Sequence, residues 1–323
     1  MRIGLASVAA MALVGCGSAI SVKAEGEPGQ AQADVSCPSE GEFLQVLGSG
    51  GPIAEGGSSA RAGTSYLLWI DGDARLLIDA GAGSFLRFAQ ARANISDLDA
   101  VLLTHLHADH VGDLPGILNT GGFEGRSDPL PVIGPDAAPR FPGTGEFLDR
   151  LLSKDSGAFA YNGGYLDGSE NKPLLEPRDI ATGEGDADPT GLDIANEYSV
   201  MAHPVHHGPV PALGYVIDFG AKSFVITGDQ SFLSERFLTD LTGSKPTILF
   251  AHHVINGDDG QPRGLHRTPG QIGELAGALD AQRLVLTHNM QRSLTQIDQG
   301  LTSIAENYSG PVAVADDLDC FAL

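Results

Sequence analysis

Four metal-binding side chains lie within six consecutive residues: His105, His107, Asp109 and His110. They follow an apolar run, residues 100–103, which we predict to be a buried strand. Because side chains alternate along an extended backbone, the first two histidines point to the same side, and a turn after them lets the aspartate and the last histidine face the same point. Imidazole and carboxylate together suit zinc, and such a cluster can hold two ions.

A two-metal site needs about three more ligands, and other parts of the chain can supply them. Three further apolar segments end in such groups: Asp229, the pair His252 and His253, and His288. Another histidine group consists of His203, His206 and His207. Because functional groups collect beyond the carboxyl ends of strands in α/β sheets, we predict that these segments converge on one edge of the fold.

The order of these motifs resembles that of the metallo-β-lactamase-fold hydrolases over residues 43–311. HLHADH, HHGP and TGDQ are similar to the first metal motif of that family, its second histidine motif, and the segment with the aspartate that bridges both ions. The resemblance implies an α/β fold, a four-layer αββα sandwich of the metallo-β-lactamase type. It implies one ion on His105, His107 and His207, a second on Asp109, His110 and His288, and Asp229 between them.

Within that superfamily, the chain is most similar to the branch of ribonuclease Z, arylsulfatase-like and cyclic-nucleotide phosphodiesterase-like enzymes. The motifs LGSGGP, HGPVPALGY and HRTPGQIG carry this similarity. The resemblance implies that Asp109 also handles the proton of the nucleophile and that His266 stabilises developing charge or protonates the leaving group. That branch often has glutamate where this chain has His253, which we expect to assist His266.

Several other residues near these motifs are expected to support the ligands or the fold. We predict that His203 and His206 are structural or lie beside the ligands, while the role of His252 stays open. Asp79 either orients a ligand histidine or forms a turn before glycine. Tyr215 is expected to pack beneath the site.

The length of 323 residues, 42% of them hydrophobic, is enough for a large core. We predict one hydrolase domain over residues 41–323, with an irregular insertion at about residues 135–196. Aromatic residues of the insertion are expected to form a substrate wall: Phe159, Tyr161 and Tyr165. The apolar residues before them are expected to turn a helix face into the core: Phe147, Leu148, Leu151 and Leu152.

The charge balance is strongly acidic, with 41 Asp and Glu against 19 Lys and Arg, a net charge of −22. This balance disfavours an extended phosphate backbone as a partner, so we predict no nucleic-acid partner. A small anionic ester remains compatible, because bound metal ions supply local positive charge.

The first residues have the features of an export signal. Residues 1–24 contain an apolar run too short to span a bilayer, and LVGC at residues 13–16 matches a bacterial lipoprotein cleavage box ending in Cys16. VKA at residues 22–24 offers an ordinary cleavage site as the alternative. We predict a periplasmic protein of the cell envelope, attached to the membrane only through lipid at Cys16, with residues 25–40 as a flexible tether.

Two further cysteines, Cys37 and Cys320, remain after the signal. In an oxidising compartment they can form a disulfide that joins the two ends of the domain. The alternative is that both are free buried thiols.

These features predict an exported dinuclear metal-dependent hydrolase of small phosphodiesters or related sulfate or phosphonate esters, with a metal-bound hydroxide as nucleophile. Two divalent ions are expected, with zinc as the first choice and manganese or iron as alternatives. The alternatives for function are a lactonase or β-lactamase of the same fold, or a non-catalytic metal-binding lipoprotein. The resemblance implies cysteine or serine at the Asp229 position in zinc β-lactamases, which disfavours that activity. The sequence predicts neither the particular substrate nor the oligomeric state.

Overall fold

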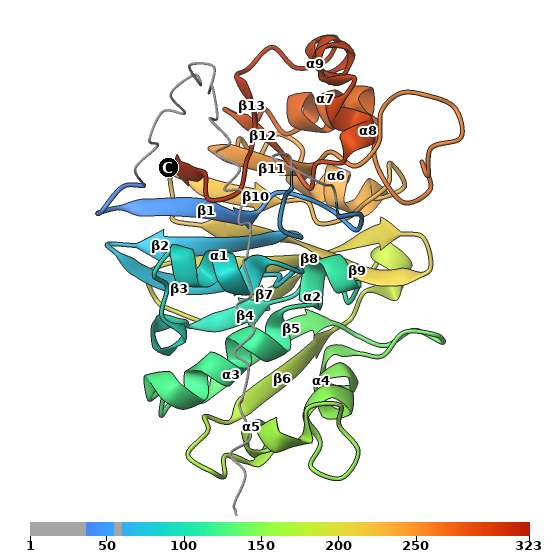
Figure 1. Ribbon diagram of the computed structural model, residues 1–323. Helices are drawn as coiled ribbons and strands as arrows, with labels where there is room; N and C mark the ends of the chain where they lie inside the picture. The colour runs from blue at the N-terminus through green and yellow to red at the C-terminus, as the bar shows by residue number, and fades with distance from the viewer. Residues whose placement is uncertain (1–36, 55–59) are drawn as a thin grey trace, which may run out of the picture. The chain divides into compact units, whose positions relative to one another are not determined.

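Two seven-stranded sheets form the centre of the fold in the computed structural model, which describes residues 37–54 and 60–323 (Figure 1). The predicted signal sequence, residues 1–24, lies outside the described residues, as do residues 25–36 of the predicted tether. No helix of the described ranges is long and apolar enough to cross a membrane.

The first sheet is mixed: its strands are antiparallel from β14 to β3 and parallel from β3 to β6. Its order is β14 (Cys320–Ala322), β1 (Glu42–Gly48), β2 (Ser65–Ile70), β3 (Asp73–Ile78), β4 (Ala100–Leu102), β5 (Leu130–Pro135) and β6 (Leu175–Ile180). The last strand of the chain thus lies beside the first, as Figure 1 shows.

The second sheet is also mixed, with parallel strands from β10 to β13 and antiparallel strands from β7 to β10. Its order is β13 (Val312–Val314), β12 (Leu284–Thr287), β11 (Ile248–His252), β10 (Ser223–Ile226), β9 (Val210–Asp218), β8 (Ser199–His207) and β7 (Thr190–Leu192). The parallel part of each sheet therefore contains strands that end in the motifs described above.

Three separate hydrophobic clusters show that the fold has four layers. One cluster contains side chains of both sheets, such as Leu44 and Phe224. The neighbouring residues Phe43 and Val225 belong to the two outer clusters, because alternate side chains of a strand face opposite sides. The outer cluster of the first sheet includes residues of α1 (Ser84–Gln90), α3 (Leu114–Glu124), α4 (Thr144–Leu152) and α5 (Gly164–Asp167). The outer cluster of the second includes residues of α6 (Glu235–Leu241), α7 (Pro269–Ala278) and α9 (Ile297–Ala305). The predicted αββα sandwich is confirmed.

The segment 135–196 is more regular than predicted, since it contains α4, β6 and β7. β6 and β7 are edge strands, and the four middle residues of β6 are exposed. An edge strand tolerates proline and charged residues, so the sequence of β6, LEPRDI, shows no clear apolar alternation.

The aromatic residues of this segment do not form the predicted substrate wall together. Tyr165 is fully buried in the core beneath α3, and its hydroxyl donates to the carbonyl of Leu118. Tyr161 is 66% exposed, and Phe159 packs against the same core. The helix preceding them turns its apolar face into the core, as predicted.

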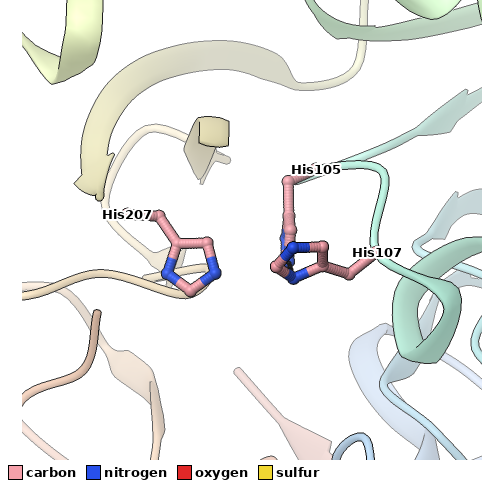
Figure 2. Close-up of side chains that lie close together, drawn as sticks. All are labelled: His105, His107 and His207. Atoms are coloured by element: carbon pink, nitrogen blue, oxygen red, sulfur yellow. Dashed lines mark hydrogen bonds between the residues drawn. The ribbon is translucent and has the colours of Figure 1, made fainter. Parts of the chain in front are cut away.

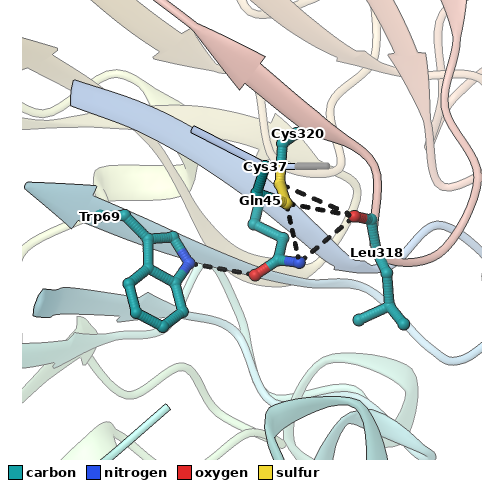
Figure 3. Close-up of a disulfide and its surroundings, with 5 residues drawn as sticks. All are labelled: Cys37, Gln45, Trp69, Leu318 and Cys320. Atoms are coloured by element: carbon teal, nitrogen blue, oxygen red, sulfur yellow. Dashed lines mark hydrogen bonds between the residues drawn. A yellow bond between two sulfur atoms is a disulfide. The ribbon is translucent and has the colours of Figure 1, made fainter. Parts of the chain in front are cut away.

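A disulfide joins Cys37 to Cys320, whose Cα atoms are 5.4 Å apart (Figure 3). Beside it, the Gln45 amide donates to the carbonyl of Leu318 at 3.2 Å and accepts from the Trp69 indole at 3.1 Å. The disulfide joins two cysteines that are 283 residues apart in sequence, and it lies beside the pairing of β1 with β14.

Candidate metal centre

The ends of parallel strands from both sheets meet at one site. β4 leads to the HLHADH motif, whose last residues form the short helix α2 (Ala108–Val111). β10, β11 and β12 lead to the other groups: Asp229, His252 and His288. The structure brings all seven predicted ligands into groups whose donor atoms lie within 4.8 Å of one another.

Three histidines form the first group, and Figure 2 shows their rings turned toward one another. His105 Nε2 lies 2.9 Å from His107 Nδ1. His207, at the end of β8, completes the group, and its buried Nε2 has no hydrogen-bond partner among the described residues. A buried imidazole nitrogen without a partner is costly in apolar surroundings, and a metal ion would satisfy it.

The second group consists of Asp109, His110 and His288. His288 Nε2 lies 3.1 Å from His110 Nε2 and 3.2 Å from Asp109 Oδ2. Donor atoms about 3.3 Å apart are expected around a tetrahedral ion with bonds of about 2.0–2.1 Å. The spacing therefore matches one divalent ion.

Asp229 lies between the two groups. Its Oδ2 is 3.7 Å from His207 Nε2 and 3.9 Å from both His105 Nε2 and His110 Nε2. Its Oδ1 is 3.4 Å from His288 Nε2. One carboxylate thus faces donors of both groups, as a bridging ligand must.

Asp79 fixes the orientation of His110. Its carboxylate accepts hydrogen bonds from the Thr104 amide and hydroxyl, both at 2.7 Å, and from His110 Nδ1 at 2.8 Å. Nε2 of the same ring is thereby directed at the second group, and such carboxylate–histidine contacts tune ligand basicity. Asp79 also has a φ of 57°, so it both forms the turn and orients the ligand.

His252 and Tyr66 form a chain of contacts that the sequence does not reveal. His252 Nδ1 donates to Asp229 Oδ1 at 2.7 Å, and its Nε2 lies 3.0 Å from the Tyr66 hydroxyl. That hydroxyl is 2.7 Å from Thr287 Oγ1. The contacts connect Asp229 to Tyr66 and Thr287, and His252 also forms a possible donor group with Asp229 and His288. Tyr215 packs under the site as expected, with its hydroxyl donating to the Leu103 carbonyl at 2.8 Å.

His266 lies close to both groups and forms a further possible donor group with His207 and Asp229. Its buried Nδ1 is 3.8 Å from Asp229 Oδ2 and has no hydrogen-bond partner within the part of the chain that the structure describes. The next residue, Arg267, is buried and donates two hydrogen bonds to Gln230, which follows Asp229. These bonds connect the loop of His266 to the loop of the central aspartate.

The structure does not bring His253 to the metal centre. Its Nδ1 lies 3.2 Å from Asn289 Oδ1, and in residues 37–54 and 60–323 no hydrogen bond or ion pair joins it to Asp229 or His266. Adjacent residues at a strand end face opposite sides, so when His252 faces the metal groups, His253 faces away, toward α9. Its predicted role in assisting His266 is not supported by this placement.

The other two histidines also stay outside the donor groups. His203 is buried against Phe237, with ring centroids 5.7 Å apart. His206 Nδ1 lies 2.9 Å from the Ser231 hydroxyl. Both have structural contacts, in agreement with their predicted roles.

Burial controls the protonation of the first group. It lowers the pKa of each of its members: His105, His107 and His207. These rings are therefore neutral near pH 7, which is the form that binds metal.

The carboxylates are held in their ionised form. Burial raises the pKa of Asp229, but the surrounding histidines outweigh it and hold that pKa well below the usual range. Burial also raises the pKa of Asp109, but the contacts with His288 and His110 outweigh this effect and lower the pKa of Asp109 to about 2. Burial lowers the pKa of His110, but Asp79, Asp109 and Asp229 together outweigh burial and raise that pKa to about 9.

The donor set suits divalent metal ions, since neutral imidazoles and ionised carboxylates are the ligands that zinc prefers. Each group offers three protein donors and shares the central carboxylate. Fold and site together define a metal-dependent hydrolase.

Comparison with known proteins supports this class. A sequence profile described as the metallo-beta-lactamase superfamily matches residues 59–288. The chain therefore belongs to the metallo-β-lactamase superfamily. It is 30% identical over 289 residues to ribonuclease Z of Mycolicibacterium gilvum (strain PYR-GCK), covering 85% of this chain and 94% of that protein. It is 34% identical over 289 residues to ribonuclease Z of Mycobacterium bovis (strain BCG / Pasteur 1173P2), covering 85% and 96%.

Solved structures show the same fold. YhfI from Bacillus subtilis, a metallo-beta-lactamase fold protein, has a TM-score of 0.62 at 21% identity, covering 87% of this chain and 98% of that chain. Unliganded yeast PDE1 has a TM-score of 0.61 at 13% identity, covering 88% and 100%. Zn²⁺-bound PqqB from Methylobacterium extorquens has a TM-score of 0.56 at 17% identity, covering 87% and 100%.

The relatives confirm two predictions and overturn a third. The predicted branch and the predicted class of enzyme, a metal-dependent hydrolase acting on ester bonds, are confirmed. The prediction of no nucleic-acid partner is wrong, because the similar proteins are named ribonuclease Z. Net charge sums over the whole surface, whereas recognition depends on the local charge at one site, so the value of −22 could not decide this point.

Proposed function

We propose that this protein hydrolyses phosphodiesters with two divalent metal ions, of which zinc is the first candidate. The observation that carries the proposal is the position of Asp229 between two three-donor groups. Two ions held a few ångströms apart are the usual arrangement for displacement at phosphorus. The similarity to ribonuclease Z supports a phosphodiester as the substrate.

The residues of the chain have distinct roles in this proposal. His105, His107 and His207 would hold one ion, the group with His288 the other, and Asp229 both. When bound, such ions supply a water of lowered pKa and a Lewis acid for an ester oxygen. Asp109, ionised and close to His288, can accept a proton near the reacting atoms.

His266 can act without binding metal. Burial lowers its pKa to about 3, so the ring is neutral and its Nδ1 or Nε2 can donate a hydrogen bond to developing charge. Its Nδ1 faces the central carboxylate at 3.8 Å. This position supports a role in stabilising the leaving group.

The deciding experiment combines metal analysis with a substrate panel. The purified chain should contain two ions and should hydrolyse bis(p-nitrophenyl) phosphate or an RNA 3′ end, and a chelator should abolish this activity. Aryl sulfate, lactone and cephalosporin substrates test the alternatives within the fold.

Asp229→Ala should lower metal content and turnover together. Full metal content with near-wild-type turnover in that variant would refute the bridging role, and turnover of the lactone or cephalosporin alone would refute the phosphodiester proposal.

We also propose that the protein is exported and lipid-anchored at Cys16. The disulfide between Cys37 and Cys320 supports export, because disulfides persist mainly in oxidising compartments. Mass spectrometry of the native protein should find a mature chain that begins at Cys16 and carries lipid. A chain that begins at Glu25 without acyl mass would refute the anchor.

A further inference from the structure

A cavity of about 410 Å³ is lined in part by the turn that directly follows His207, a candidate ligand of the first group. Its walls come from three loops: residues 136–141 after β5, residues 182–184 after β6, and residues 208–211 between β8 and β9. β5 and β6 run parallel to β4, so their carboxyl ends lie at the same edge of the sheet as His105. The third loop begins directly after His207.

The β8–β9 turn shapes the cavity wall closest to the metal groups. Gly208 has a φ of 59°, which a side chain would disfavour, and it is followed by Pro209. A Cβ at Gly208 would also lie 2.6 Å from the Leu265 side chain, and the Leu265 carbonyl accepts the hydrogen bond of His207 Nδ1 at 3.0 Å. The turn that lines the cavity therefore packs against Leu265, the residue whose carbonyl holds His207.

The cavity combines apolar walls with a single guanidinium. Phe141, Val210 and Pro211 provide apolar surface. Arg140 is exposed and, among the described residues, makes no ion pair or hydrogen bond. Several other arginines pair with acids, for example Arg75, which pairs with Asp99 at 2.8 Å.

The two acidic residues that line the cavity, Asp136 and Glu184, do not pair with Arg140. Asp136 Oδ1 accepts from the Thr182 amide at 3.1 Å and from its hydroxyl at 2.7 Å. Glu184, on the second loop, is exposed and makes no ion pair with Arg140. A free guanidinium in a chain of net charge −22 is a site for an anion brought by a ligand.

We propose that this cavity binds the non-reacting side of the substrate and that Arg140 pairs with a second anionic group there. This inference rests on the proposed phosphodiesterase function and deepens it. Phe141 and the neighbouring prolines pack against a flat ring between the two anionic groups. The substrate class is therefore a phosphodiester with a ring and a second phosphate, the pattern of a nucleotide unit.

Two chromogenic substrates test this assignment: the p-nitrophenyl ester of thymidine 5′-phosphate, with and without a 3′-phosphate. Water adds to phosphorus, and the bond to the p-nitrophenolate leaving group breaks. Arg140→Ala should lower kcat/KM about tenfold for the 3′-phosphorylated substrate, mainly through KM, because a guanidinium–phosphate contact is lost. The value for the other substrate should stay within about twofold. Arg178→Ala is the matched control, since Arg178 is also exposed and without a partner in the described ranges, but lies on β6 outside the cavity.

Calorimetry with thymidine 3′,5′-bisphosphate and thymidine 5′-phosphate separates this inference from the proposed function. The wild-type protein should bind the bisphosphate more tightly, and Arg140→Ala should abolish the difference. Equal affinities for both ligands in the wild type, or equal effects of Arg140→Ala on both substrates, would overturn the role of the cavity. Binding of this kind without turnover of either ester would refute the proposed function and leave the cavity assignment in place.

Discussion

Replacing Asp79 by asparagine should weaken the second metal group without unfolding the protein. The Asp79 carboxylate accepts three hydrogen bonds of 2.7–2.8 Å, two from Thr104 and one from His110 Nδ1. An asparagine of the same size has one acceptor oxygen, and its NH₂ group would face a donor. At least one of the three hydrogen bonds is then lost, and the imidazole is no longer held toward the metal.

The expected size follows from the loss of this orienting contact. Removing the hydrogen-bond partner of a ligand histidine typically costs about 10–100-fold in metal affinity, or about 1.4–2.8 kcal/mol. The loss should fall mainly on the ion held by Asp109, His110 and His288, because His110 bonds directly to Asp79, whereas His105 reaches it, among the described residues, only through the Thr104 hydroxyl, 3.2 Å from His105 Nδ1. At limiting free zinc, the stoichiometry should therefore fall from two ions toward one.

Competition between the metal-free protein and a chelator of known affinity measures both steps. Asp113→Asn is the matched control, because the Asp113 carboxylate also accepts two backbone hydrogen bonds, from Gly83 and Phe85, at 2.7 and 3.0 Å. The control should bind two ions with wild-type affinity. If Asp79→Asn also retained both affinities within about twofold, the orienting role would be refuted.

Three further variants test other parts of the structure. His266→Ala should keep both ions but slow hydrolysis by roughly 10²-fold or more, as metal analysis with kinetics will show, and loss of an ion would make the residue a ligand instead. Burial lowers the pKa of His253 from 6.5 to about 4. Below pH 6.5 the unfolded chain therefore binds more protons at this residue than the folded chain, and the free energy of unfolding falls as the pH drops from 6.5 to about 4. The loss is up to about 3 kcal/mol, and urea unfolding of His253→Gln should show a shallower pH dependence than the wild type over that window. Replacing Cys37 and Cys320 together by serine should lower the free energy of unfolding by about 2–5 kcal/mol in denaturant titrations, with little change in metal content.

The positions of several candidate ligands could be predicted because they follow apolar strands, whereas the assignment of the full set, His207 at the end of β8 included, came from the resemblance to the motifs of the family. His105 and His107 come after β4, and Asp229 and His288 come after β10 and β12. Local order along the chain therefore carried the information about where the side chains meet. The αββα architecture followed from the same succession of motifs.

Other features depend on contacts between distant segments and left no local pattern. Tyr66 lies in the middle of an ordinary apolar strand, yet its hydroxyl reaches His252 across 186 residues of sequence. His253 follows an apolar strand, as a ligand histidine would, but its side chain lies on the face opposite the metal centre. The sequence did not predict the edge strands β6 and β7, because the exposed residues of an edge strand need no apolar alternation.

The disulfide has a consequence for the integrity of a cleaved chain. Cys37 and Cys320 enclose nearly every residue of both sheets, so one peptide bond cut anywhere between them leaves two fragments that remain covalently linked. A protease that cuts an exposed loop, such as the one around Glu170, would therefore release neither piece. The nicked protein should migrate as one band without reductant and as two bands with it. Because both sheets bury extensive apolar surface against each other, the linked fragments should also stay folded around the metal centre.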